Sequence, residues 1–428
     1  MALQFGFAFQ REALEPAPPS NAIMSVVGLC APMTKATGVQ DSDFTGAFPL
    51  NTPVMFNTTD AMARMIDPLT PVGDAISALN SQLGKMQRSA RVIVTRVDEG
   101  TNQDPAAKYL ETAANIIGNS STGTGLYSFK KAGAIVGCYP RLVACPGYTS
   151  QMPEDADVNP IAAALPPILN SYLGVAVVDA PGTNEADAIT YREGIASDRI
   201  IVCEPDVKVL EAGVIVRRPL SPRILGIAVR RDFEYEGRPS HSWANQPVYG
   251  IVAPGRYIDF SLTDGSTEGQ DLLGHQVGVL VRGESGDDFA IADGGFVAVV
   301  YENCDEASGG IWQQLHKTRM RDFIELTALR TLRYYLGKFN LTTHTIQVIV
   351  NVISDILTIS QSKGDILGFV CRFDPDTNNP DDLRQGHIYI DARFEEAPMF
   401  RMATIESRPH RPALDATIAA LTASTVLV

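Results

Sequence analysis

Two apolar runs of the chain read GVAVVD (residues 174–179) and RIIVCE (residues 199–204), and a segment of helical composition, residues 184–194, lies between them. Neither run alternates apolar with polar residues, which is typical of strands that are covered on both faces of a sheet. Strand, helix and strand in this order predict an α/β domain. The same alternation predicts a further strand at 135–145 and a further helix at 162–172.

The composition changes on either side of this stretch and predicts a multidomain protein of the α/β and α+β classes. Short strands and helices precede the α/β stretch, whereas two long helices and then strands follow it. Pro-rich or small residues at the two ends predict extended strand arms. The predicted segments are 1–20 (strand arm and Pro-rich linker), 21–100 (small α+β domain), 101–305 (central α/β domain), 306–408 (C-terminal domain) and 409–428 (tail or arm).

Within the flanking domains, periodicity predicts individual elements. Apolar residues four apart in 74–86 predict a helix, and the run RVIVTRV predicts a strand at 91–97. Short β-like pieces such as 257–262 predict an irregular edge of the central domain. The C-terminal domain is expected to contain helices 314–340 and 345–359 and strands 387–394 and 399–406, and residues 424–428 are compatible with a last short strand.

The first residues carry an alternating aromatic pattern. Phe5, Phe7 and Phe9 recur at every second position, which predicts a β-strand with one aromatic face. A proline-rich linker, residues 15–20, follows the strand. Because a lone terminal strand needs a sheet to join, two interpretations stay open. The strand pairs within its own domain, or the linker lets it add to a sheet of a neighbouring subunit.

Charge and composition exclude several classes of protein. The chain has 428 residues, a formal net charge of -14, and 45% hydrophobic residues. An acidic surface repels phosphate backbones and acidic lipids, so we expect neither nucleic acid nor a membrane as a partner. We find no apolar run long enough to span a bilayer and no secretory signal in the first residues. These features predict a soluble protein that is made in a cytoplasm.

A basic stripe marks the first C-terminal helix. On a helical wheel Arg319, Arg330 and Arg333 fall opposite the apolar stripe, because eleven residues complete about three turns. The basic residues of this region (Lys317, Arg319, Arg321, Arg330, Arg333 and Lys338) outnumber the acidic ones (Asp322 and Glu325). The stripe predicts either an ordinary exposed amphipathic helix or a basic surface that faces an acidic partner.

The cysteines lie far apart in the sequence, and none belongs to a Cys-x-x-Cys pair, so the sequence suggests no zinc or redox motif. Two interpretations stay open: buried free thiols, or disulfides that form after the protein leaves the reducing cytoplasm. The candidates for such bonds are Cys30, Cys138, Cys145, Cys203, Cys304 and Cys371.

A search for catalytic chemistry finds little in the sequence. The chain has no phosphate-binding loop, no His-Glu-x-x-His pair and no nucleophile elbow. The histidines are scattered, with no pair at metal-ligand spacing. We therefore expect no enzyme activity, no cofactor and no metal. A cysteine nucleophile with a distant histidine is left open, because such groups meet only in the folded chain.

Several short motifs follow one another in a characteristic order. They read SVVGL (25–29), FPLNTPV (48–54), RVIVTRVDEG (91–100), TGL (124–126), ACPG (144–147), AVVDAP (176–181), CEP (203–205) and RDFI (321–324). Together they resemble the contractile bacteriophage tail sheath proteins, most closely those of the simple contractile-tailed phages. Residues 222–232 resemble a segment that the family writes as a strand ahead of Arg-x-Asp. Residues 265–300 depart from the family's pattern.

The resemblance implies a structural function. Subunits would stack as rings into a helical homopolymer around a tail tube protein, contact baseplate and tail terminator or neck proteins, and contract to drive the tube through the host envelope. Terminal arms would add strands to neighbouring subunits, and the basic helix would face the tube. The implied location is the virion tail, after assembly in the host cytoplasm. The sheath of a contractile bacteriocin or injection device stays an alternative, as does an α/β enzyme with an unrecognised site.

Overall fold

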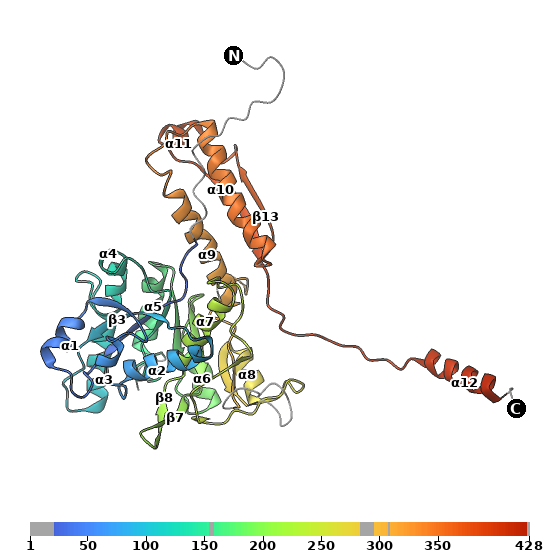
Figure 1. The fold of residues 1–428 in the computed structure, drawn as a ribbon, viewed down its shortest axis with the longest axis horizontal. Coiled ribbons are helices and arrows are strands. Elements are labelled where there is room, and N and C mark those ends of the chain that lie inside the picture. Colours follow the sequence, from blue (N-terminus) through green and yellow to red (C-terminus); the bar gives the residue numbers. More distant parts are fainter. Residues whose placement is uncertain (1–20, 154–157, 283–294, 307–308, 426–428) are drawn as a thin grey trace, which may run out of the picture. The chain divides into compact units, whose positions relative to one another are not determined.

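The computed structural model describes residues 21–425 with gaps at 154–157, 283–294 and 307–308. The chain divides into two compact units, Met1–Ala397 and Pro398–Val428 (Figure 1). The predicted strand of Phe5, Phe7 and Phe9 lies outside the described residues.

A mixed sheet forms the centre of the first unit. In the described part of the chain nine strands pair in the order β2-β3-β1-β4-β5-β6-β11-β12-β9. The strands from β3 to β11 in this order are parallel, and β2, β12 and β9 add antiparallel edges. Every residue of β5 and β6 is buried, which confirms the two apolar runs as covered strands. The bounds are β1 (Val26–Pro32), β2 (Pro53–Asn57), β3 (Arg91–Val97), β4 (Leu142–Ala144), β5 (Val175–Asp179), β6 (Ile200–Glu204), β9 (Gln246–Pro247), β11 (Val277–Val281) and β12 (Val297–Val299).

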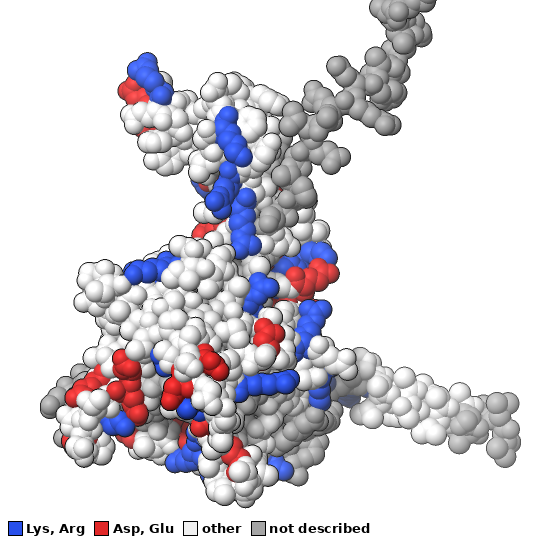
Figure 2. All heavy atoms as spheres, turned by 60° about the vertical axis from the view of Figure 1, so that its left-hand side comes forward, with Lys and Arg blue, Asp and Glu red and all other residues white. Residues whose placement is uncertain are grey.

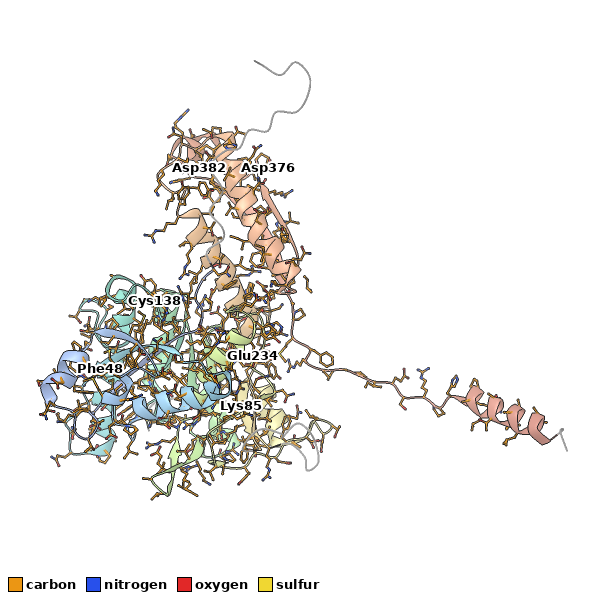
Figure 3. All side chains as sticks on the ribbon, viewed as in Figure 1. Phe48, Lys85, Cys138, Glu234, Asp376 and Asp382 are labelled. Atoms are coloured by element: carbon orange, nitrogen blue, oxygen red, sulfur yellow. The ribbon has the colours of Figure 1, made fainter. Side chains whose placement is uncertain are left out.

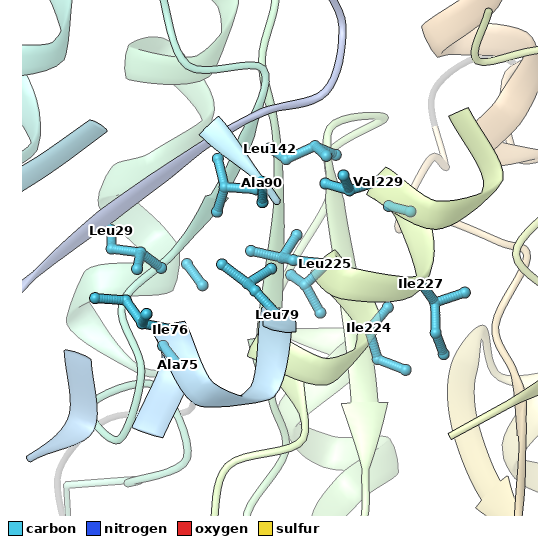
Figure 4. Close-up of a cluster of buried hydrophobic side chains, with 14 of the residues drawn as sticks. Leu29, Ala75, Ile76, Leu79, Ala90, Leu142, Ile224, Leu225, Ile227 and Val229 are labelled. Atoms are coloured by element: carbon cyan, nitrogen blue, oxygen red, sulfur yellow. The ribbon is translucent and has the colours of Figure 1, made fainter. Parts of the chain in front are cut away.

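Helices cover the two faces of this sheet because successive side chains of a strand point to opposite sides. Leu29 of β1 belongs to the core formed with α2 and α7. Figure 4 shows Ile76 of α2 next to Leu29, and Leu79 of α2 next to Leu225 of α7. The next residue, Cys30, points the other way and donates its thiol to the Ile116 carbonyl of α3. The helices are α1 (Asp41–Ala47), α2 (Pro71–Leu83), α3 (Pro105–Ile117), α4 (Ala132–Ile135), α5 (Pro160–Asn170), α6 (Glu185–Glu193), α7 (Ser221–Glu234) and α8 (Glu268–Gly274), with short 3-10 turns at Ala63–Met65, Gly84–Met86 and Gly125–Lys131.

Local capping explains where several helices begin. The Thr70 hydroxyl accepts a hydrogen bond from Gly73 N at the start of α2, and Pro71 occupies the first helical position. Asp104 and Asn184 cap α3 and α6 in the same way. A further small sheet joins β10 (Ala253–Pro254), β7 (Val207–Glu211) and β8 (Val214–Arg218).

The last part of the first unit has its own apolar cluster. It consists of α9 (Leu315–Leu332), α10 (Thr343–Ser362), α11 (Pro380–Arg384) and a hairpin of β13 (Ile366–Phe373) with β14 (Ile390–Glu396). Figure 1 shows β13 alongside α10, and the two pack together. Phe323 and Ile324 of α9 meet Ile356 and Leu357 of α10 in this cluster.

The structure corrects several sequence predictions. Residues 222–232 form part of α7 rather than a strand, and residues 135–141 precede β4 rather than belonging to it. Residues 257–262 and 399–406 form no strand, whereas β13 was not predicted. Strands on both sides of residue 100 share one sheet, so the predicted domain boundary there corresponds to no break in the fold. Mixed α/β architecture is confirmed in its coarse form.

The second unit contains the helix α12 (Arg411–Thr425), where only a weakly patterned tail was predicted. The side chains of residues 400–423 are exposed. Its larger apolar residues, Leu414, Ile418 and Leu421, follow helical spacing of four and three. Residues 426–428 lie outside the described part, so the short terminal strand stays a prediction.

Candidate assembly surfaces

The first half of α9 lies inside the first unit. Arg319 is only 1% exposed, and its guanidinium donates to both Asp232 carboxylate oxygens at 2.9 and 2.7 Å. The same guanidinium donates to the Met24 carbonyl and lies over the Trp243 ring, 5.3 Å from its centroid. Burial raises the pKa of the Asp232 carboxyl, and Arg319 opposes that rise. The prediction that Arg319 lies on an exposed basic face is wrong, because α7 and Trp243 cover the side that the helical wheel assigned to solvent.

Other charges in this half of α9 are also matched by distant residues. Asp322 accepts two hydrogen bonds from Arg199, at 2.6 and 3.0 Å, which ties α9 to the start of β6. Arg321 pairs with the buried Glu396 at 2.7 Å, and Lys317 pairs with Glu395 at 2.8 Å. The predicted excess of positive charge is therefore neutralised in the first half of the helix.

The helix α9 ends at Leu332, eight residues before the predicted end at residue 340. The basic residues at and after this point, Arg330, Arg333 and Lys338, which we call the basic end of α9, differ from the first half of the helix. No carboxylate lies within ion-pair distance of these three side chains in the part of the chain that the structure describes. The Lys338 ammonium lies over the ring of Tyr334, 4.9 Å from its centroid. Figure 2 shows a row of basic side chains, with few acidic ones beside it, on the part of the unit that carries α9 to α11.

Aromatic and aliphatic side chains accompany the basic end of α9. Tyr334, Tyr335 and Phe339 form a cluster with ring centroids 5.2 to 5.8 Å apart. Leu336 is 81% exposed, and Tyr334 and Phe339 are also exposed. Unmatched cations beside exposed apolar groups can bind an acidic protein surface with an apolar contact in its centre.

A short extended segment, residues 21–24, runs along α9 before the chain enters β1; we call it the N-terminal strap. The Arg330 guanidinium donates to the Asn21 carbonyl at 2.8 Å. Ala22 N donates to the Thr327 hydroxyl at 3.1 Å, and the Met24 carbonyl accepts from Arg319 at 3.2 Å. The side chains of Ala22 and Met24 are buried in the α9–α10 cluster. The described chain therefore begins at the basic end of α9, and Arg330 is engaged by the strap.

The β13–β14 hairpin offers unpaired strand edges. Phe369 and Phe394 lie opposite each other and pack on the α10 side, whereas Leu367 and Val370 are exposed. Among the described residues no third strand joins this sheet. Two strands alone are marginally stable, and a free edge can accept the backbone of another strand.

All six cysteines are free in the structure, and Cys30, Cys145, Cys203 and Cys304 are buried. Burial raises the pKa of the Cys304 thiol to about 12, which disfavours the reactive thiolate. Cys138, in the loop between α4 and β4 (Figure 3), and Cys371 of β13 are partly exposed. These two are the candidates that remain accessible for a bond between subunits.

Polar groups at the carboxyl ends of the central strands hold the fold together. Asp179 accepts hydrogen bonds from Ser221 N at 2.7 Å and from the Ser221 hydroxyl at 2.5 Å, and so fixes the start of α7. Burial raises the pKa of the Asp179 carboxyl, and the hydrogen bonds from Ser221 and Thr149 oppose this rise.

Across the described ranges, no group of three or more His, Cys, Asp or Glu side chains could hold a metal ion. None of the described helices is long and apolar enough to cross a membrane.

Comparison with known proteins gives a consistent set of relatives. No family model matches the chain. A Pseudomonas aeruginosa protein named as a prophage major tail sheath protein is 23% identical over 87% of this chain and 88% of its own length. The tail sheath protein of Escherichia phage P2 is 22% identical over 84% of this chain and 86% of its own length.

The fold is similar to that of solved structures. The anti-feeding prophage helical sheath in its contracted state superposes with a TM-score of 0.63, covering 96% of this chain and 100% of that chain, at 14% identity. The sequence relatives are structural proteins rather than enzymes, so an unrecognised catalytic site is not supported.

Proposed function

We infer the function of this chain from its family, because it belongs to the contractile tail sheath proteins. It is a structural subunit that polymerises and contracts, not an enzyme. The observation that carries this conclusion is the agreement of sequence and fold over nearly the whole chain. Head-to-tail contacts that do not close generate a helical polymer, and its shortening would push an enclosed tube forward.

The interior of the first unit supports movement as one body. The Arg319–Asp232 and Arg199–Asp322 pairs join α9 to α7 and to the central sheet, and all four side chains are buried. A buried pair is strongly destabilising to break, because the remaining charge has no water around it. We therefore propose that subunits rotate as rigid bodies during contraction and that the links between them are extended segments.

Links between subunits would come from strand addition. The free edges of the β13–β14 hairpin support this proposal, since each can accept one more strand. Candidate donors are the Phe5, Phe7 and Phe9 strand and residues 399–406, whose Phe400 and Met402 alternate as in a strand and are exposed. Residues 399–406 have a strand-like sequence but form no strand within their own chain, which fits a donor that pairs only with another copy.

Tube contact would use the basic end of α9. Arg333 and Lys338 are exposed and have no carboxylate partner in the described chain, and Leu336 lies between them. This arrangement supports a weak, salt-sensitive contact with an acidic tube surface. Arg319 takes no part, since it is buried against Asp232.

Electron microscopy of the purified full-length chain and of a chain that lacks residues 1–20 tests these proposals. Tubes or stacked rings that disappear on truncation are expected. Tubes from both chains would leave the sheath function intact but assign the link to the C-terminal segment. Discrete small particles from both chains over a wide concentration range would contradict the sheath function.

An injection device is the second candidate for the particle, because the matched contracted structure is that of the anti-feeding prophage. The mechanics would be the same.

A disulfide between subunits can be tested on either particle by gel electrophoresis without reductant. Cys138→Ser and Cys371→Ser are the informative variants, and the buried Cys304→Ser is the control. A dimer band that survives both exposed-site variants would rule out the two accessible thiols.

A further inference from the structure

We propose that the N-terminal strap is a reserve of chain length: under tension residues 21–23 detach from α9 and move the anchor of the N-terminal arm from Asn21 to Met24. The inference rests on the proposed function, in which residues 1–20 connect neighbouring subunits. It adds a device that lets this connection lengthen while subunits rotate.

The order of contacts determines where tension acts. The chain bonds to α9 at Asn21, Ala22 and Met24 before it enters β1. Because β1 lies between β3 and β4 in the central sheet, a pull on residue 21 reaches α9 before it reaches the sheet. Separation of the strap therefore precedes any disturbance of β1.

The three contacts are graded in strength from the outside inward. The Arg330–Asn21 bond is exposed, so water competes for both groups. The Ala22–Thr327 bond is buried, with Thr327 2% exposed. Arg319 is 1% exposed and is held on its other side by two bonds to Asp232. Opening should begin at Arg330 and stop at Arg319.

The geometry sets the size of the reserve. Residues 21–24 alternate between exposed and buried side chains, as in an extended chain. Release of the three residues 21–23 adds about 10 Å of reach at roughly 3.3 Å per residue. An arm that stays paired with its neighbour can then follow a rotating body without losing its strand contacts.

Hydrogen exchange at the Ala22 amide tests the proposal on assembled particles. In extended particles we expect Ala22 to be protected, and in contracted particles to exchange faster, whereas β1 amides stay protected in both. Equal protection of Ala22 in the two states would overturn the proposal.

Two substitutions distinguish the effect of losing a strap contact from the effect of losing a charge at the basic end of α9. Thr327→Val removes the acceptor of Ala22 N without changing the charge, and should make the Ala22 amide exchange at least about fivefold faster, as expected from the loss of one hydrogen bond. Arg333→Ala is the control, because it removes a charge from the basic end of α9 but no strap contact. Particles of Thr327→Val should contract at lower denaturant concentration than wild type.

The isolated chain keeps the test independent of assembly. If neither wild type nor any variant polymerises, the proposed sheath function is wrong. Hydrogen exchange in the unassembled chain still tests whether the strap opens separately from the rest of the unit. Faster exchange confined to residues 21–23 in Thr327→Val supports a separately opening segment. Unchanged exchange there, or equal acceleration through residues 26–32, would refute it.

Discussion

The first half of α9 and its basic end carry the same residue types in opposite environments. Arg319 is buried and bonded to Asp232, whereas Arg333, fourteen positions later, is exposed and has no carboxylate partner among the described residues. The difference arises from neighbouring elements, because α7 and the central sheet cover only the first half. A stripe of arginines on a helix therefore indicates a binding surface only where nothing else packs against it.

The largest expected effect follows from breaking the buried pair. Arg319→Ala leaves Asp232 as an uncompensated buried charge and should lower the free energy of unfolding by about 3–5 kcal/mol. Urea denaturation of the unassembled chain measures this loss. Arg333→Ala serves as the matched control, and a loss of similar size in both variants would contradict the comparison.

A double substitution sharpens this result. Arg319→Met together with Asp232→Leu replaces both charges by apolar groups, so no buried charge is left without a partner. The double variant should be more stable than Arg319→Ala. A double variant as unstable as the single one would indicate that the Met24 carbonyl bond or the Trp243 contact, rather than the ion pair, holds this half of the helix.

The second effect concerns His316 in the buried half. Burial, with smaller contributions from Lys317 and His241, lowers the pKa of His316 to about 4, and the bond to the Ala397 carbonyl opposes this shift. Below pH 6.5 the His316 imidazole binds a proton in the unfolded chain, whereas in the folded chain it stays neutral until about pH 4. The free energy of unfolding therefore falls as pH falls through this window. Between pH 7 and 4.5, His316 should lower the free energy of unfolding by about 2–3 kcal/mol.

Denaturation of wild type and His316→Gln at both pH values isolates this contribution from that of the carboxylates. The variant should lose less stability on acidification than wild type. The same substitution at the exposed His344 is the control. Identical pH dependence in wild type and His316→Gln would show that the buried imidazole does not resist protonation.

The smallest effect is expected at the exposed end. Arg333→Ala and Lys338→Ala should change the free energy of unfolding by less than about 0.5 kcal/mol. Each should weaken attachment to a tube by about 0.2–1 kcal/mol, and less at high salt. Co-sedimentation with tube protein at two salt concentrations measures this, and a loss that is independent of salt would argue against a charge contact.

The central strands could be predicted from the sequence because a strand that is buried on both faces is an uninterrupted apolar run. The runs at 174–179 and 199–204 contain β5 and β6, and β3 begins and ends where the RVIVTRV run does. The sequence of α7 contains no pattern that is as easy to assign. Ser221 to Arg230 are all buried, so no exposed polar face marks the helical period, and the strand expected there came from the resemblance to the family.

The charge pairs could not be predicted, because their partners are distant in sequence. Arg319 meets Asp232 across 87 positions, and Arg223 meets Asp74 across 149. A helical wheel contains neither partner. The hairpin strand β13 was missed because Gly368 and a shift in register interrupt its alternation, and the roles of the strand arms depend on other copies that a single chain does not contain.

The strap also has a consequence for synthesis of the chain. Ala22 and Thr327 are 305 positions apart, so the first described residues acquire their anchor only after most of the chain has left the ribosome. Until then, the segment that would connect subunits has no fixed starting point on its own body. We expect nascent chains that end before residue 315 to be cleaved readily by protease near residue 21, and resistance there in such chains would contradict this timing. The position of one hydrogen bond would thereby delay polymerisation until each subunit is complete.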